Sequence, residues 1–181
     1  LDTEVAIIAE IGVNHEGSLA AAEKMLDLAA EAGADAVKFQ TYSPDRYASA
    51  SDPARLARVG GFSLSEENFR SLSERAKARG IYFFSTPLSE DVVPHLTEIA
   101  DAIKIASGDL TFEPTVRATA RSGHAVILST GLGTLAEIDR AVGWLKDEIG
   151  AADLPQKVVL MQCISAYPTP IEEANVLSVP L

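Results

Sequence analysis

The sequence predicts an α/β protein with the architecture of a (β/α)8 TIM barrel. About six βα units are expected within the 181 residues, so the last two strands are missing. Short apolar segments recur between segments of helical periodicity, which is the pattern of a buried parallel sheet flanked by helices. No glycine-rich dinucleotide fingerprint follows the first apolar segment, which favours a barrel over a doubly wound sheet.

Six segments are expected to form strands because each joins an apolar start to β-forming residues. They cover residues 5–12, 36–42, 81–87, 102–108, 125–131 and 157–165. A complete barrel needs eight strands and typically about 250 residues. We therefore interpret residues 1–181 as a single, incomplete barrel domain. The missing strands indicate truncation, because an open barrel would expose edge strands and apolar surface.

Helices are expected between these strands, and Ser18 is the expected cap of the first helix. After the first strand, apolar residues recur at three-to-four spacing and a glycine follows at the expected end of the helix: Leu19, Ala22, Leu26, Ala29 and Gly33. Ser65 precedes two acidic residues and predicts another helix start, while Thr134 with Glu137 forms a possible capping box. Thr169 is followed by a proline at the first helical position, which predicts a further start there.

One connection, residues 43–63, is unusually long for a compact domain. It follows the second expected strand and contains the pair Gly60 and Gly61. Loops of this length are usually functional lids or partly disordered, and both alternatives are kept.

The composition argues against several classes of partner and location. A formal net charge of −11 would repel nucleic acid and anionic lipid, so neither is expected as a partner. No apolar run approaches the roughly 18 residues of a membrane-spanning helix, and the amino end lacks the features of a signal peptide. The single cysteine, Cys163, cannot form an internal disulfide, which suits a reducing compartment. A cytoplasmic protein that contacts no membrane is expected.

Polar residues appear near the end of each expected strand, after its apolar start. They are Glu10, Lys38, Gln40, Ser85, Thr86, Lys104, Ser107, Ser129, Thr130, Gln162 and Ser165. In a (β/α) barrel these ends meet at the face that holds the active site. The gradient therefore predicts a shared polar pocket, to which Glu10 belongs.

Two lysines stand between apolar neighbours, where an uncompensated ammonium would be costly to bury. Lys38 lies between Val37 and Phe39, and Lys104 lies between two isoleucines. Each lysine can pair with an acid such as Glu10 or extend to solvent. Two lysines together with several hydroxyls favour an anionic ligand instead, such as a phosphorylated small acid.

Four other residues were weighed as candidates for the site. His15 has no second histidine at metal-ligand spacing, so hydrogen bonding or helix capping is the favoured interpretation. Cys163 is interpreted as a small buried apolar residue. Trp144 ends a helical apolar stripe and is interpreted as a core residue, so Tyr167, which follows the sixth strand and precedes a proline, is a better candidate than Trp144 for contact with a ligand.

Six motifs resemble one known family in their order and spacing: AEIGVNHEGS, GADAVKFQTY, STP, IKIASGDL, VILSTGLGTLAEI and YPTP. The family is that of the sialic acid synthases, which includes N-acetylneuraminate, legionaminate and pseudaminate synthases. The resemblance implies a transferase of polysaccharide biosynthesis that condenses phosphoenolpyruvate with an open-chain N-acetylated amino sugar, such as N-acetylmannosamine. The products would be phosphate and a nine-carbon 2-keto sugar acid.

The resemblance also implies roles for particular residues. Glu10 matches the catalytic acid beside the reacting carbons, and Gln40 and Tyr167 match positions that contact the sugar. The positions that hold phosphoenolpyruvate match Lys38, Thr86, Lys104, Ser107 and Ser129, to which we add Ser165, where some members carry asparagine.

The family's divalent metal, manganese or magnesium, is bound by histidines on the seventh and eighth strands. Their motifs are absent here, as is the antifreeze-like domain that follows the barrel in many members, so no metal ligand is assigned within this chain. This chain also has Gln162 where many members carry a histidine. The full-length protein is expected to be a homodimer.

Two alternatives to this interpretation stay open. One is another barrel aldolase or phosphoenolpyruvate-dependent synthase, since this fold supports many chemistries. The other is a non-catalytic fragment that binds sugar acids. The sequence does not select the acceptor sugar.

Overall fold

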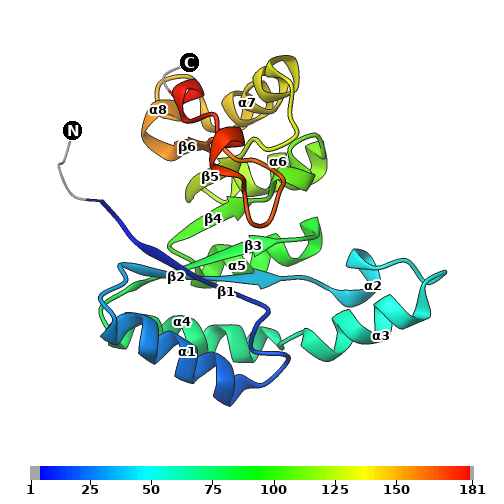
Figure 1. Ribbon diagram of the computed structural model, residues 1–181, viewed down its shortest axis with the longest axis vertical. Helices are drawn as coiled ribbons and strands as arrows, with labels where there is room; N and C mark the ends of the chain where they lie inside the picture. Colours follow the sequence, from blue (N-terminus) through cyan, green and yellow to red (C-terminus); the bar gives the residue numbers. More distant parts are fainter. Residues whose placement is uncertain (1–4, 180–181) are drawn as a thin grey trace. The chain divides into compact units, whose positions relative to one another are not determined.

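A computed structural model describes residues 5–179 of the chain. Contacts divide the chain into two compact units, one ending at Asp101 and the other beginning at Ala102, and each is described by itself. In both units parallel strands alternate with helices along the chain (Figure 1). The elements of the first unit are β1 (Ile8–Gly12), α1 (Leu19–Glu31), β2 (Ala36–Thr41), α2 (Pro44–Tyr47), α3 (Pro53–Phe62), α4 (Glu66–Ala78), β3 (Tyr82–Pro87), the short 3-10 helix η1 (Glu90–Val92) and α5 (Val93–Ile99).

The first unit is built on three parallel strands, with β2 between β1 and β3. Phe39 of β2 is fully buried and stacks on Phe83 of β3, with 5.5 Å between the ring centroids. The edge of Phe69 from α4 packs against Phe39, and Leu26 of α1 is also fully buried. Burying a side chain of this size stabilises a fold by about 1.5–3 kcal/mol. These contacts make the core between the strands and helices α1 and α4.

The expected starts of α1 and α4 are confirmed. The side chain of Ser18 accepts a hydrogen bond from Ala21 N, and that of Ser65 accepts one from Asn68 N. Figure 1 shows the two helices side by side, and the ion pair between Arg75 and Asp27 joins them at 2.6 Å. The caps and this ion pair fix the layer that covers one face of the strands.

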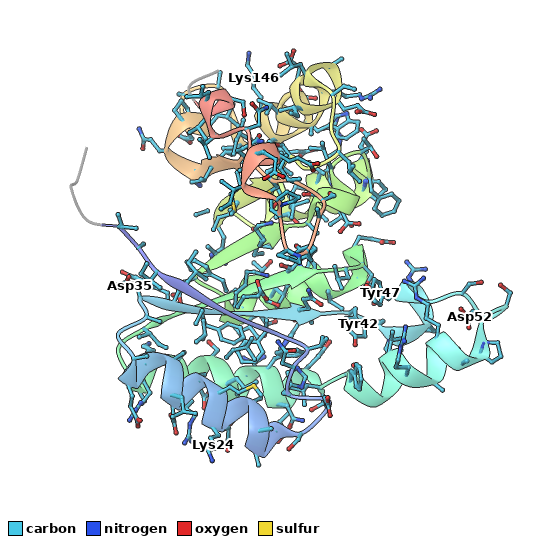
Figure 2. The ribbon with its side chains drawn as sticks, viewed as in Figure 1. Lys24, Asp35, Tyr42, Tyr47, Asp52 and Lys146 are labelled. Atoms are coloured by element: carbon cyan, nitrogen blue, oxygen red, sulfur yellow. The ribbon has the colours of Figure 1, made fainter. Side chains whose placement is uncertain are left out.

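The long connection after β2 folds into helices α2 and α3. Its buried residues include Ala48 and Val59, which pack around Tyr42 at the end of β2. The Tyr42 hydroxyl donates to the carbonyl of Val59 at 3.0 Å, and its ring lies 4.8 Å from that of Tyr47 (Figure 2). The connection therefore has a small core of its own, so the alternative of partial disorder is wrong for residues 43–63. Its role as a lid stays a prediction.

The second unit also contains three parallel strands, with β5 between β4 and β6. Its elements are β4 (Ala102–Ile105), the 3-10 helix η2 (Ser107–Asp109), α6 (Glu113–Arg121), β5 (Ala125–Ser129), α7 (Leu135–Ile149), α8 (Leu154–Lys157), β6 (Val158–Met161), η3 (Ile171–Glu173) and η4 (Val176–Ser178). Val126 and Leu128 of β5 are fully buried, and Leu145 of α7 and Val116 of α6 belong to the same core. Trp144 packs against this core, in a partly buried position.

Helix α7 begins as the sequence predicts. Thr134 and Glu137 form a capping box, in which the Glu137 carboxylate accepts from Thr134 N at 2.8 Å and the Thr134 hydroxyl accepts from Glu137 N at 3.3 Å. Helices α6 and α7 are joined by Glu148, which accepts from Arg117 at 3.0 Å and from Arg121 at 2.8 Å. These contacts fix the start of α7 and hold α6 and α7 together.

Two sequence predictions about element boundaries are wrong. The expected strands 102–108, 125–131 and 157–165 end earlier, at Ile105, Ser129 and Met161, because the chain leaves the ladder of the parallel strands and turns into loops. Thr169 does not cap a helix. Its hydroxyl donates to the carbonyl of Ala166 at 2.9 Å, and two short 3-10 turns, Ile171–Glu173 and Val176–Ser178, follow among the described residues. Within residues 5–179 no helix is both long and apolar enough to cross a membrane.

Candidate active site

The first unit brings three predicted residues together at the carboxyl ends of its strands. Glu10 and Lys38 lie opposite each other on β1 and β2, where the pairing register shifts between Glu10 and Gly12. The Lys38 Nζ lies 2.6 Å from Glu10 Oε2 and donates to the hydroxyl of Thr86 on β3 at 3.0 Å. The acid-pairing alternative for Lys38 is thus confirmed, whereas its contact with phosphoenolpyruvate stays a prediction.

The Glu10–Lys38 ion pair contributes little to stability but holds an accessible carboxylate in place. The Glu10 side chain is 52% exposed and that of Lys38 13% exposed. An ion pair with one half-exposed partner contributes only about 0–1 kcal/mol to stability. The pair instead fixes the position of a carboxylate that solvent or a substrate can reach. An ammonium has three N–H donors, and the contacts with Glu10 and Thr86 use two of those of Lys38.

Gln40 lies on the same side of β2 as Lys38, because side chains alternate along a strand. It pairs in register with Thr86, which is 3% exposed. Ser85 points the other way. Its hydroxyl forms a 2.7 Å hydrogen bond with that of Thr41 and donates to the carbonyl of Phe39 at 3.3 Å. Ser85 is therefore a satisfied core residue, while Gln40 and Thr86 stay with the candidate site.

His15 acts as a hydrogen-bonding residue of the loop between β1 and α1. It is 2% exposed, and its Nδ1 accepts from the N–H of Gly17 at 3.1 Å. Burial lowers the pKa of its imidazole. The sequence-based interpretation of His15 as a hydrogen-bonding residue is confirmed.

The second unit brings together a further group of predicted residues around the end of β5. The Nζ of Lys104, on β4, donates to the carbonyl of Ile105 at 2.9 Å and to the hydroxyl of Ser129, on β5. Lys104 and Ser129 are 9% and 5% exposed. The thiol of Cys163 lies 3.3 Å from the same hydroxyl and donates to it. Because Ser129 Oγ accepts these bonds, its own hydrogen can be donated to a ligand.

Ser107, in η2 after β4, and Ser165, in the loop after β6, both lie close to Gly131. The N–H of Gly131 donates to Ser107 Oγ at 3.0 Å. A Cβ placed on Gly131 would lie 2.8 Å from Ser107 Oγ and 3.1 Å from Ser165 Oγ. Tyr167 is 100% exposed, so the structure does not bring it to this group, and its contact with a sugar stays a prediction.

Two features of the second unit were missed from the sequence. Burial raises the pKa of Asp109 above its usual range, and the nearby charge of Lys104 opposes that rise. The sequence signal that could have identified it is an acidic residue two positions after Ser107, in the short 3-10 helix η2 that follows β4. Cys163 is half-buried rather than buried, and it contacts a predicted site residue instead of filling the core.

A groove of about 610 Å³ lies at the opposite end of β3 from Thr86. Its lining includes Lys77 of α4, Tyr82 at the start of β3 and Glu98 of α5. None of the predicted site residues lines this groove. Its position at the amino end of a parallel strand separates it from the chemistry expected at the carboxyl ends.

The side chains of residues 5–179 contain no group of three or more His, Cys, Asp or Glu residues placed to hold a metal ion. These described residues alone do not fit a divalent cation. Dependence on manganese or magnesium, with ligands outside this segment, stays a prediction.

Comparison with known proteins decides the family. The family model described as the NeuB family matches residues 25–180. The chain belongs to the NeuB family. Among NeuB relatives, the N,N'-diacetyllegionaminic acid synthase of Campylobacter jejuni is 36% identical over 93% of this chain and 54% of its own length. The chain spans about half the length of the curated relatives that it matches.

Solved structures show the fold class. The N-acetylneuraminic acid synthetase of Leptospira borgpetersenii superposes with a TM-score of 0.88 and 34% identity, over 98% of this chain and 60% of that one. A truncated 3-deoxy-D-arabino-heptulosonate 7-phosphate synthase of Thermotoga maritima superposes with a TM-score of 0.65 at 19% identity, over 90% of this chain and 53% of that one, and shows likeness of fold alone. The prediction of six βα units of a (β/α)8 barrel is confirmed.

Proposed function

We propose that the protein to which this chain belongs condenses phosphoenolpyruvate with an open-chain N-acetylated amino sugar. The products would be a nine-carbon 2-keto sugar acid of the sialic acid type and phosphate. Several relatives of this chain in the NeuB family are named as synthases of sialic-type acids. Within that family, one observation in the structure supports the proposal most strongly. Each unit has a lysine directed to hydroxyls at its strand ends, with Lys38 beside Thr86 and Lys104 beside Ser129.

The group in the second unit suits the phosphate and carboxylate of phosphoenolpyruvate. Lys104 supplies a buried positive charge, and Ser129 supplies a hydroxyl whose hydrogen is free to be donated. Ser107 and Ser165 add two hydroxyls close to Gly131. Hydrogen bonds from an ammonium to an oxyanion are among the stronger ones in proteins, and more so away from water. We assign the binding of phosphoenolpyruvate chiefly to these residues.

The pair in the first unit suits the carbon chemistry. In the proposed reaction, C3 of the enol attacks the aldehyde carbon of the sugar, the aldehyde oxygen takes up a proton and becomes a hydroxyl, and positive charge develops at C2. A carboxylate near C2 stabilises that charge or removes a proton from the water that adds there. Phosphate then leaves from the tetrahedral intermediate with cleavage of its C–O bond. We assign the carboxylate role to Glu10, which Lys38 holds in place at 2.6 Å.

The test of this function uses the full-length protein. Phosphate release should require both phosphoenolpyruvate and an N-acetylated amino sugar, and mass spectrometry should detect the nine-carbon product. Trapping of pyruvate on Lys38 or Lys104 by borohydride, without phosphate release, would indicate an imine-forming aldolase instead. Calorimetric binding of sugar acids without turnover would indicate a binding protein. Either result would overturn the proposal.

Glu10→Gln tests the carboxylate role directly. The change keeps the size of the side chain and removes its charge, so we expect turnover to collapse while affinity for phosphoenolpyruvate is largely retained. Steady-state kinetics and calorimetry on the same preparation separate the two effects. Normal turnover by this variant would end the role assigned to Glu10.

A further inference from the structure

We propose that Gly131 is a positioning residue of the phosphoenolpyruvate site. Its missing side chain keeps open the space between Ser107 and Ser165, and its N–H holds the Ser107 hydroxyl so that the hydroxyl donates to the bound anion. This inference rests on the proposed function and extends it to a residue outside the predicted site.

The position of Gly131 is fixed by its neighbours in the turn after β5. Thr130 N donates to the carbonyl of Met161 at 3.1 Å, and the Thr130 hydroxyl donates to the same carbonyl at 2.9 Å. Gly133 N donates back to the carbonyl of Thr130 at 3.1 Å and closes the turn. These bonds attach the loop to the end of β6, so its backbone cannot shift freely to make room for a side chain.

Space, and not backbone conformation, explains why this position holds a glycine. Gly131 is not among the glycines with positive φ. A Cβ would nevertheless lie 2.8 Å from Ser107 Oγ, 3.1 Å from Ser165 Oγ and 3.3 Å from the Cβ of Cys163. The first of these separations is shorter than real Cβ contacts, so at least one hydroxyl would have to move. A methyl group here would occupy the space between two hydroxyls expected to bind one ligand.

The hydrogen bond from Gly131 determines what Ser107 can do. A hydroxyl has one hydrogen and two lone pairs. Because Ser107 Oγ accepts from the Gly131 N–H at 3.0 Å, one lone pair is occupied and the hydrogen is directed elsewhere. An anion beside Ser107 would receive that hydrogen. Gly131 therefore acts through Ser107, which is the basis for a test that separates its role from packing.

The test measures the affinity of the full-length protein for phosphoenolpyruvate by calorimetry in a double-mutant cycle. Gly131→Ala should weaken binding by about tenfold or more, because overpacking displaces the hydroxyls. The Ser107→Ala variant lacks the nearest clashing atom. In that variant, Gly131→Ala should weaken the binding of phosphoenolpyruvate by about threefold or less. In kinetics, the KM for phosphoenolpyruvate should rise while kcat at saturation stays near the wild-type value.

Gly143→Ala is the matched control, because Gly143 lies in α7 with nothing within 4 Å of an added Cβ. It should bind phosphoenolpyruvate like the wild type. The role of Gly131 would be overturned, without affecting the proposed function, by undiminished affinity in Gly131→Ala. Equal losses of affinity on adding Gly131→Ala to the wild type and to Ser107→Ala would overturn it as well. Failure of the wild type to bind phosphoenolpyruvate would overturn the proposed function instead.

A measurement on the wild type covers the case in which Gly131→Ala does not fold. In a nitrogen-15 spectrum of the full-length protein, the Gly131 amide signal should move when phosphoenolpyruvate is added, and the Gly143 signal should stay. A stationary Gly131 signal at saturating ligand would overturn the inference.

Discussion

Replacing Gly17 with alanine is expected to destabilise the first unit far more than an ordinary glycine substitution does. Gly17 lies in the loop between β1 and α1, with a φ of +79°. An added Cβ would lie 2.1 Å from the carbonyl oxygen of Gly61, at the end of α3. That oxygen belongs to the backbone, so a side-chain rotation cannot relieve the clash.

The magnitude has two parts. A non-glycine residue in the left-handed region costs about 1–2 kcal/mol. Forcing a methyl group into filled space costs about 1–3 kcal/mol more, so the free energy of unfolding should fall by about 2–5 kcal/mol in total. Gly33 provides the control, since its φ is +87° and nothing lies within 4 Å of an added Cβ. Gly33→Ala should therefore lower the free energy of unfolding only by the backbone contribution of about 1–2 kcal/mol.

The assay is urea unfolding of each variant, followed by circular dichroism, with free energies obtained by linear extrapolation. The difference between Gly17→Ala and Gly33→Ala isolates the contact with Gly61. If the two variants lose the same stability, α3 moves away from the loop at no cost, and the argument for a fixed contact fails.

Two further predictions concern charge. Lys104→Ala should weaken phosphoenolpyruvate binding in the full-length protein by about tenfold or more, through loss of a charge-assisted hydrogen bond; unchanged affinity by calorimetry would remove Lys104 from the site. The hydrogen bonds from Arg121 and Arg117 lower the pKa of Glu148 below its unfolded value. The resulting stabilisation is therefore complete above the unfolded pKa and is lost as the pH falls through the folded pKa. Unfolding midpoints of Glu148→Gln should depend less on pH in the acid range, and an identical acid dependence would contradict this account.

The sequence predicted elements well where local chemistry determines them. Ser18, Ser65 and Thr134 each cap a helix with the hydrogen bond expected of that residue type. Thr169 has the same sequence signature but bonds backward to Ala166, and between Thr169 and residue 179 the structure shows only short 3-10 turns. A capping residue satisfies the first N–H groups of a helix, but the helix itself depends on an apolar face that packs. Residues after Thr169 are largely exposed and lack that packing.

The site residues were predicted from their types, whereas their contacts were not. Alternation along a strand placed Lys38 and Gln40 on one side of β2, and the pairing with Glu10 was an open alternative. The importance of Asp109 and Gly131 depends on burial and on distances between loops. Such distances follow from the folding of several segments and leave no periodic pattern in the sequence.

The two lysines, which sequence analysis assigned to one task, are held in different ways. Lys38 is paired with a half-exposed carboxylate at 2.6 Å, so much of its charge is already compensated by Glu10. The hydrogen bonds of Lys104 to Ile105 and Ser129 go to uncharged oxygens, and Lys104 is 9% exposed. The charge of Lys104 also acts on the nearby Asp109, and the Ser129 hydroxyl beside Lys104 keeps a hydrogen that an anion can accept. Lys104 is therefore the better candidate for holding the substrate, and Lys38 for orienting the carboxylate that acts on it.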